Sequence, residues 1–239
     1  MALQKKVGDT MRYEHIQPGV FVARPNRFIA HVEIGGQLVV AHVKNTGRCK
    51  ELLVPGATVY VDYVSSPHRK TQYDLVAVEK GNLLINMDSY APNIAFGEYL
   101  CQGRFAPLGQ LTHVKAEARY HQSRFDFYVE TATERAFIEV KGVTLEADGV
   151  AMFPDAPTLR GVKHLNHLAQ CLEEGYQAYA VFIVQMQGMR YFTPNNKMHA
   201  AFGATLKEVA AKGVQVLALA CTVTPESMVV DGELPVVLP

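Results

Sequence analysis

Residues 123–145 read SRFDFYVETATERAFIEVKGVTL, and this stretch decides the fold of the second half of the chain. Two apolar runs, at 125–129 and 137–140, flank a polar link that is short enough to connect the two strands of a hairpin. The stretch therefore predicts a pair of antiparallel strands, and the faces of these strands carry candidate functional residues.

The predicted hairpin gathers charged side chains at one place. Successive side chains of a strand point to opposite faces, so Glu139 and Lys141 share a face while Val140 points into the other layer. Antiparallel pairing brings Asp126 beside them. Two neighbouring carboxylates repel each other unless a cation lies between them, and Mg2+ is typically held by one or two carboxylates with water and phosphate oxygens. The alternative is an exposed hairpin whose charges are ordinary and solvated.

The spacing of these residues, D-x12-E-x-K, is similar to that of the PD-(D/E)xK nuclease superfamily. The resemblance implies that Asp126 and Glu139 hold a metal ion, with Val140 offering a backbone carbonyl and Glu117, on a helix or segment before the hairpin, completing the shell. It also implies that Lys141 positions or deprotonates the attacking water.

The segments after the hairpin fit the same superfamily. Apolar residues three or four apart predict an amphipathic helix over residues 159–174, with Thr158 as its N-cap. An apolar run at 178–185 then predicts a buried strand. A second helix over 196–212 and a strand over 214–220 make the second half an α/β domain.

A closer resemblance covers residues 19–237. The chain resembles the sugar fermentation stimulation protein (SfsA-like) family through an ordered set of strings: NTG at 45–47, LLVPG at 52–56, SRFDF at 123–127, EVKGVTL at 139–145, FPDA at 153–156, RGVKHL at 160–165 and VTP at 223–225. The resemblance implies an N-terminal OB-fold domain, a C-terminal PD-(D/E)xK domain, nucleic-acid binding and a bacterial or archaeal cytoplasm. The sequence departs from the expected pattern at Arg48-Cys49, where Ser-Met or a similar pair is expected, and at Gly142, where many relatives would have Asn or Ser.

The composition limits the partners. The chain has 239 residues, with 23 basic and 23 acidic side chains, so any binding of phosphates must come from local patches rather than from a strongly basic surface. The four cysteines are scattered without metal-ligand spacing, which fits a reducing cytosol. No apolar run approaches the roughly 20 residues of a membrane span, so we expect a soluble protein with no membrane partner.

Short β-like runs separated by Gly and Pro turns fill the first half, which favours an OB-fold-like barrel. We expect a flexible N-terminus over residues 1–14, the barrel over 15–85 and a PD-(D/E)xK restriction-endonuclease-like α/β domain over 86–239. The candidate residues for nucleic-acid binding are Arg24, Arg27, Phe28, Lys44, Arg48, Arg69 and Lys70 on the barrel, with Arg160, Lys163 and His164 on the first helix after the hairpin. For the barrel residues, solvated surface charge is an equally good interpretation.

These observations predict a nucleic-acid-binding protein that cleaves a phosphodiester with Mg2+ or Mn2+, acting on DNA rather than RNA. Whether it forms a homodimer is left open. One alternative is a non-catalytic DNA-binding regulator of sugar (maltose) metabolism, which binds DNA in a salt-sensitive way without cleaving it. The other is a nucleotide-sensing module that uses the mouth of the barrel as its pocket.

Overall fold

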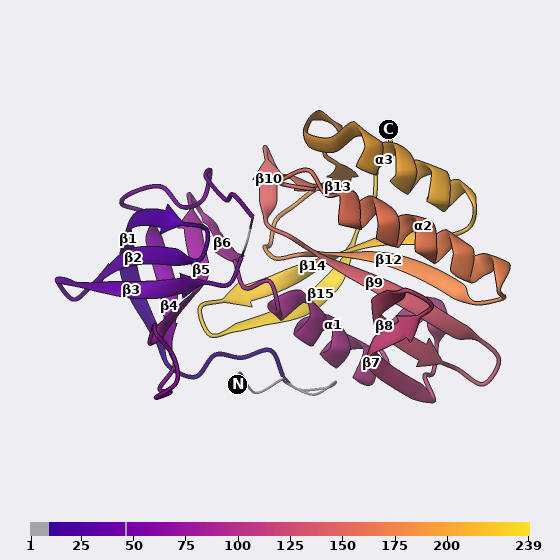
Figure 1. Cartoon of the computed structure of the whole chain (residues 1–239), viewed down its shortest axis with the longest axis horizontal. Helices are drawn as coiled ribbons and strands as arrows, with labels where there is room; N and C mark the ends of the chain where they lie inside the picture. Colours follow the sequence, from indigo (N-terminus) through magenta and orange to yellow (C-terminus); the bar gives the residue numbers. More distant parts are fainter. Residues whose placement is uncertain (1–9, 46) are drawn as a thin grey trace.

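The computed structural model describes residues 10–45 and 47–239, and its two domains lie side by side (Figure 1). The N-terminal domain is built from six strands in the order β3-β2-β1-β4-β5-β6. A parallel pairing of β3 with β5 closes the barrel, so the expected OB-like domain is confirmed. Its strands are β1 (Ile16–Asn26), β2 (Ile29–Ile34), β3 (Gln37–Val43), β4 (Thr58–Tyr63), β5 (Tyr73–Lys80) and β6 (Leu83–Asn86).

Alternation of apolar and polar residues builds this barrel. Ala30 and Val32 of β2 and Ala41 of β3 are fully buried, while their sequence neighbours are more exposed. The link from β2 to β3 is Gly35-Gly36, with φ of 56° and 80°. Two successive positive φ values are what a tight hairpin turn requires, and glycine adopts them without steric cost.

The C-terminal domain is a six-stranded sheet in the order β15-β14-β12-β9-β8-β7. Helix α1 (Ala91–Cys101) packs on one face, and α2 (Leu159–Glu173) and α3 (Asn196–Ala211) cover the other (Figure 1). The strands are β7 (His113–Tyr120), β8 (Ser123–Glu130), β9 (Arg135–Val143), β12 (Gln177–Val184), β14 (Gln215–Thr224) and β15 (Ser227–Leu234). A 3-10 turn (Ala106–Leu108) follows α1, and a small sheet at the edge contains β10 (Leu145–Ala147), β11 (Val150–Phe153) and β13 (Tyr191–Pro194).

Strand β9 lies inside the sheet between β8 and β12, and its two faces differ. Ile138 and Val140 pack in the layer of α1, whereas Phe137 and Val143 pack in the layer of α2 and α3. Alternation places Glu139 and Lys141 on one face, as predicted from the sequence, and the structure shows that this face is the α2 side.

The hairpin predicted at residues 125–140 is β8 and β9, which pair antiparallel from Phe127↔Ile138 to Glu130↔Arg135. The helix predicted after Thr158 is α2, and the Thr158 Oγ1 atom accepts a hydrogen bond from the Gly161 amide at 3.0 Å. Glu117, expected on a helix or segment before the hairpin, lies on strand β7, and the chain after β9 forms the β10–β11 hairpin.

The predicted flexible N-terminus needs a partial correction. Residues 1–9 lie outside the described residues. Of the remainder, Met11 is 1% exposed and Tyr13 is 8% exposed, so residues 10–14 are not loose. The reason is that these two side chains pack in the α1 layer with apolar residues of the second domain.

A buried polar cluster joins the two domains just before α1. The Gln185 side-chain amide donates to the Asn86 Oδ1 atom at 3.1 Å, and Asn86 donates to the Tyr13 hydroxyl at 2.9 Å. Asp88, 1% exposed, forms an ion pair with Lys44 of the barrel. Because buried polar groups are costly unless they are paired, this cluster fixes the start of α1 relative to the sheet. Within residues 10–45 and 47–239, no helix is both long and apolar enough to cross a membrane.

Candidate functional site

Asp126 lies where β8 and β9 begin to separate. The last paired residues before this point are Phe127 and Ile138, and the next backbone amide of β9 that needs an acceptor belongs to Val140. The Asp126 Oδ2 atom accepts from that amide at 2.7 Å, and its Oδ1 atom accepts from the Asn93 side chain at 2.7 Å. The carboxylate therefore replaces a ladder hydrogen bond and lies against β9, as the hairpin predicted.

Glu139 is the most buried acid of the site, with 3% of its surface exposed. Its Oε1 atom is hydrogen-bonded by Lys141 Nζ and by His164 Nδ1. His164 in turn accepts at Nε2 from Arg160 Nε at 3.4 Å, so the imidazole donates to the glutamate and accepts from the arginine. The other carboxylate oxygen, Oε2, is buried and has no hydrogen-bond partner among the described residues.

The pKa values of the two acids are shifted in opposite directions by burial and by neighbouring groups. Burial raises the pKa of Asp126 to about 6, and the nearby charge of Glu139 adds to this increase. Burial also opposes the ionisation of Glu139, but the hydrogen bond from His164 and the charge of Lys141 outweigh it, and the Glu139 pKa falls below its usual value. The pair thus contains one stabilised carboxylate and one whose charge is poorly compensated.

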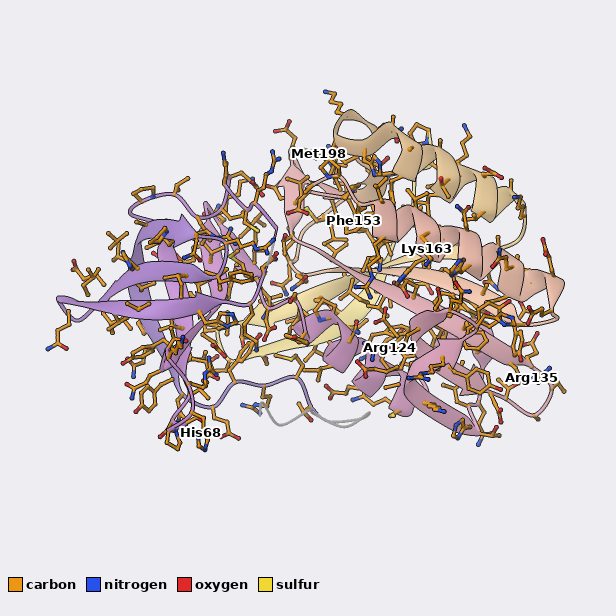
Figure 2. The ribbon with its side chains drawn as sticks, in the orientation of Figure 1. His68, Arg124, Arg135, Phe153, Lys163 and Met198 are labelled. Atoms are coloured by element: carbon orange, nitrogen blue, oxygen red, sulfur yellow. The ribbon has the colours of Figure 1, made fainter. Side chains whose placement is uncertain are left out.

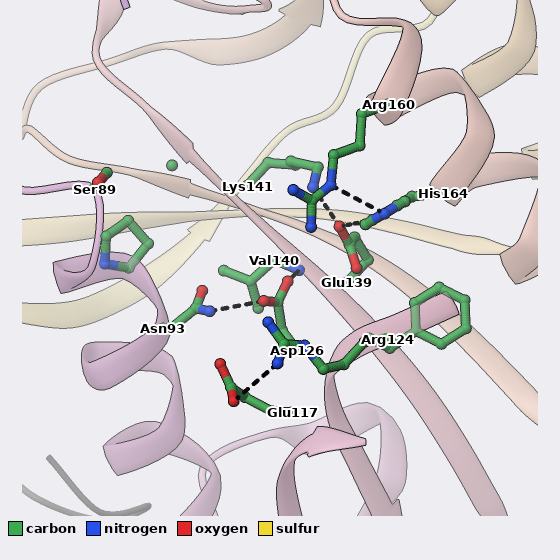
Figure 3. A pocket seen from close by; sticks show the side chains of 13 residues that line it. Ser89, Asn93, Glu117, Arg124, Asp126, Glu139, Val140, Lys141, Arg160 and His164 are labelled. Atoms are coloured by element: carbon green, nitrogen blue, oxygen red, sulfur yellow. Dashed lines mark hydrogen bonds and ion pairs between the residues drawn. The ribbon is translucent and has the colours of Figure 1, made fainter. Parts of the chain in front are cut away.

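The two acids open into a cavity of about 220 Å³ between α1, the β7–β8–β9 sheet and the start of α2. Figure 3 shows Asn93 approaching Asp126 from α1, and Lys141, His164 and Arg160 grouped around Glu139. Acidic and basic groups thus line one small cavity.

The donors suit a hard divalent cation with few protein ligands. Carboxylate oxygens are the ligands that Mg2+ and Mn2+ prefer, and the unpaired Oε2 atom of Glu139 is an oxygen with no other partner in the described chain. The described residues contain no group of three or more His, Cys, Asp or Glu side chains able to hold a metal ion. A metal here would therefore be bound by two carboxylates and completed by water, as hydrated Mg2+ commonly is.

Six of the residues predicted from the sequence line this one cavity: Glu117, Asp126, Glu139, Lys141, Arg160 and His164. Glu117 is paired with Arg124 at 3.4 Å and does not join the other acids in a metal-binding group, so its role as a third ligand stays a prediction. His164 is 8% exposed and its ring is bound to Glu139, which gives it a supporting place beside that acid; its contact with nucleic acid stays a prediction. Lys163 is exposed on α2 outside the cavity (Figure 2).

Three of the barrel residues predicted to bind nucleic acid, Arg24, Lys44 and Arg69, are paired within the chain. The Arg24 guanidinium donates to four backbone carbonyl oxygens, among them those of Asn45 and Gly47 at 2.8 and 3.0 Å, so its hydrogen bonds hold a loop in place. Arg27 stacks 4.6 Å from the ring centroid of Phe28, and both are exposed. Lys44 is paired with Asp88.

The remaining barrel residues lie on two loops. Arg48 is exposed beside the loop that Arg24 holds. Arg69 forms an ion pair with the buried Asp74, whereas Lys70 is exposed. Their loop contains His68, which lies at the edge of the barrel, far from Arg124 in the view of Figure 2. Nucleic-acid binding by the barrel residues stays a prediction. The pairing of Arg24, Lys44 and Arg69 within the chain argues against a role of these three in that binding.

Sequence reasoning missed two residues of the site, Asn93 and Arg124. Arg124 precedes Asp126 by two positions, so strand alternation places both on one face, and this signal was available. Asn93 comes from α1, and its hydrogen bond to Asp126 spans 33 residues of sequence. No local pattern marks such a contact.

Comparison with known proteins identifies the family to which the chain is similar. Residues 90–227 match the family model described as the sugar fermentation stimulation protein RE domain, and residues 22–87 match the SfsA N-terminal OB domain. A sugar fermentation stimulation protein homolog of Desulfitobacterium hafniense (strain DSM 10664 / DCB-2) is 56% identical over 218 residues, which cover 91% of this chain and 94% of the relative. A homolog of Clostridium beijerinckii is 50% identical over 228 residues, covering 95% and 100%.

A solved structure, that of Pyrococcus furiosus SfsA in complex with Ca2+, is similar to the whole fold. Its TM-score is 0.87 and its sequence identity is 29%, over 95% of this chain and 98% of that chain. The family models cover both domains, and the relatives span nearly the full length of the chain. The chain therefore belongs to the sugar fermentation stimulation protein family.

Proposed function

We propose that the protein is a nuclease that uses a divalent metal ion to hydrolyse a phosphodiester bond of a nucleic acid, DNA rather than RNA. The observation that carries this proposal is the buried Oε2 atom of Glu139, which has no partner in the described chain and lies in the same cavity as Asp126. A buried, unpaired charged oxygen is costly. A bound cation would satisfy it and would offset the burial and the repulsion by Glu139 that raise the Asp126 pKa.

Asp126 and Glu139 would hold Mg2+ or Mn2+, each through one carboxylate oxygen, while the amide of Val140 and the side chain of Asn93 fix the orientation of Asp126. When bound, such an ion polarises the phosphate and lowers the pKa of water near it. The relative from Pyrococcus furiosus was solved in complex with Ca2+, a cation that also prefers oxygen ligands, and this supports the binding of a divalent ion by this chain.

Lys141 would position the attacking water and hold a phosphate oxygen. Its ammonium group is bound to Glu139 and its side chain is 23% exposed, so it has donors left for a ligand in the cavity. His164 and Arg160 keep Glu139 in place from the other side. In the reaction the water oxygen forms a bond to phosphorus and gives up a proton, one ester P–O bond breaks, and the departing oxygen takes up a proton.

The proposal is tested by DNA cleavage with Mg2+ and with Mn2+, comparing the wild type with Asp126→Ala and Lys141→Ala. Lys115→Ala is the matched control, because Lys115 is an exposed lysine on β7 that does not line the cavity. We expect both site variants to lose cleavage while the control keeps it. Cleavage that is unchanged in Lys141→Ala would contradict the proposal.

The shared name of the relatives refers to stimulation of sugar fermentation, which favours one alternative, a non-catalytic DNA-binding regulator of sugar metabolism. This reading predicts salt-sensitive DNA binding with no cleavage under any divalent metal. A pure binding protein gains nothing from a repulsive carboxylate pair in its cavity, which is why we prefer the nuclease.

A further inference from the structure

We infer that Arg124 and Arg160 hold two backbone phosphates of the substrate, one on each side of the phosphate that is attacked. The inference rests on the proposed function, since it takes the Asp126–Glu139 pair as the reacting centre. It names the substrate class: a polynucleotide chain that runs through the cavity, rather than a mononucleotide. Figure 3 shows Arg124 on the Asp126 side of the cavity and Arg160 on the Glu139 side.

Arg124 reaches the cavity from β8. Its side chain is 59% exposed, and its Nη1 atom contacts Glu117 Oε2 at 3.4 Å, a long ion pair between two exposed groups. Such pairs contribute little to stability, because both partners remain hydrated. A phosphate can take two parallel hydrogen bonds from the same guanidinium and is a better partner for it. The arginine is therefore free to exchange the glutamate for a substrate phosphate.

Glu117 has an unusual backbone for this position. The pairs Ala116↔Phe127 and Ala118↔Phe125 flank it, so it lies opposite Asp126 across β7 and β8. Its φ is 52°, a region that non-glycine residues rarely adopt, and such strain gathers at functional sites. The strained residue lines the cavity and contacts Arg124. We assign Glu117 the role of holding Arg124 at the cavity wall until a phosphate replaces it, in place of metal binding.

Arg160 is anchored on the other side. It lies in the first turn of α2, is exposed, and uses only Nε for a protein contact, the one with His164. Its two Nη atoms have no hydrogen-bond partner within residues 10–45 and 47–239 and line the cavity. Because His164 is bound to Glu139, this contact places the guanidinium beside the carboxylate pair.

The test measures the binding of a short fluorescein-labelled DNA duplex by anisotropy, with Ca2+ present, for Arg124→Gln and Arg160→Gln. We expect each variant to bind about tenfold more weakly at low salt, and the slope of log K against log salt to fall by about one phosphate's contribution. Arg119→Gln is the matched control for charge. Arg119 is exposed on the same hairpin, in register with Arg124, and does not line the cavity. Circular dichroism confirms that each variant is folded.

A second series replaces single phosphates of the duplex by neutral methylphosphonates. The effect of Arg124→Gln should vanish when the phosphate that it contacts is neutral, because the lost interaction is then absent in both proteins. Glu117→Gln should bind the duplex at least as tightly as the wild type, since it releases Arg124.

Several results would overturn the inference: equal losses in Arg124→Gln and Arg119→Gln, no binding of the duplex by the wild type, or a mononucleotide that binds as tightly as the duplex. Failure of the nuclease proposal would look different. The arginine variants would still weaken binding and lower the salt slope, while the wild type would cleave nothing with Mg2+ or Mn2+.

Discussion

Replacing Asp126 by asparagine should stabilise the metal-free protein at neutral and alkaline pH. The pKa of Asp126 is raised to about 6 in the folded chain, against about 3.9 for an aspartate in an unfolded chain. A group with a raised folded pKa contributes stability that is complete below the unfolded pKa and is lost as the pH rises through the folded pKa. The Asp126→Asn variant has a neutral amide at this position, so it does not lose this stability as the pH rises.

The magnitude follows from the shift. About two pKa units correspond to about 3 kcal/mol of unfolding free energy. Because the Asp126 carboxylate is half-buried and keeps some contact with water, we expect about 2 kcal/mol, or a rise in melting temperature of about 5 °C for a chain of this size.

The geometry allows this substitution. The carbonyl oxygen of the new amide can accept from the Val140 amide as the Asp126 Oδ2 atom does. The other bond, from Asn93, would join two donors unless the Asn93 amide turns over, and a rotation about its last side-chain bond presents its oxygen instead. The variant therefore keeps both hydrogen bonds and removes only the charge.

The assay is urea denaturation of both proteins with a chelator present, at about pH 4 and about pH 8, followed by circular dichroism. The variant should gain stability over the wild type only at the higher pH, and an added divalent metal should stabilise the wild type alone. An equal stability of the two proteins at the higher pH, or a difference that does not change with pH, would refute the argument that Asp126 carries an uncompensated charge.

Three further changes test the supporting contacts. His164→Ala removes a hydrogen-bond donor from the buried Glu139. It should lower the free energy of unfolding, measured by urea denaturation, by about 2 kcal/mol and abolish cleavage. Unchanged cleavage would show that His164 does not support the site. Lys44→Met leaves the buried Asp88 without its cation and should cost about 3 kcal/mol by urea denaturation; a cost near zero would mean that the domains are joined by other contacts. Gly142→Ala places a methyl group 2.7 Å from a proline ring atom of α1 and should cost about 1–3 kcal/mol, and a melting temperature equal to that of the wild type would contradict the close packing.

The β8–β9 hairpin was predictable because its signals are local. Alternation along residues 137–143 predicted which side chains share a face, and the short polar link at 131–135 predicted the antiparallel pairing. From these two signals, Asp126, Glu139 and Lys141 were expected to lie close together. The helix after Thr158 was equally predictable, because the spacing of its apolar residues and its N-cap residue are both local features of the sequence.

Strand β7 was harder to predict. Its apolar positions are a valine and two alanines before Tyr120, and alanine gives only a weak alternating pattern, while the Lys and Glu between them are good helix formers. Tertiary pairing with β8 decides the outcome. Glu117 was therefore expected only on a helix or segment before the hairpin, and the strand itself was not predicted.

The charged residues of the barrel show a different limit. Arg24, Lys44 and Arg69 look like phosphate ligands in the sequence, yet each is paired with an acceptor of the chain itself: backbone carbonyls, Asp88 and Asp74. A positive side chain is satisfied equally well by a phosphate, a carboxylate or a carbonyl oxygen. Only the fold shows which of these acceptors lies within reach.

The most direct test of the central claim is calorimetric titration of Mn2+ into the wild type, Glu139→Gln and Glu117→Gln, each shown to be folded by circular dichroism. The two-carboxylate site predicts that the wild type binds the ion, that Glu139→Gln loses it because the unpaired oxygen no longer carries charge, and that Glu117→Gln retains it. Mn2+ binding that survives in Glu139→Gln, or no binding by the folded wild type, would contradict a metal site at Asp126 and Glu139.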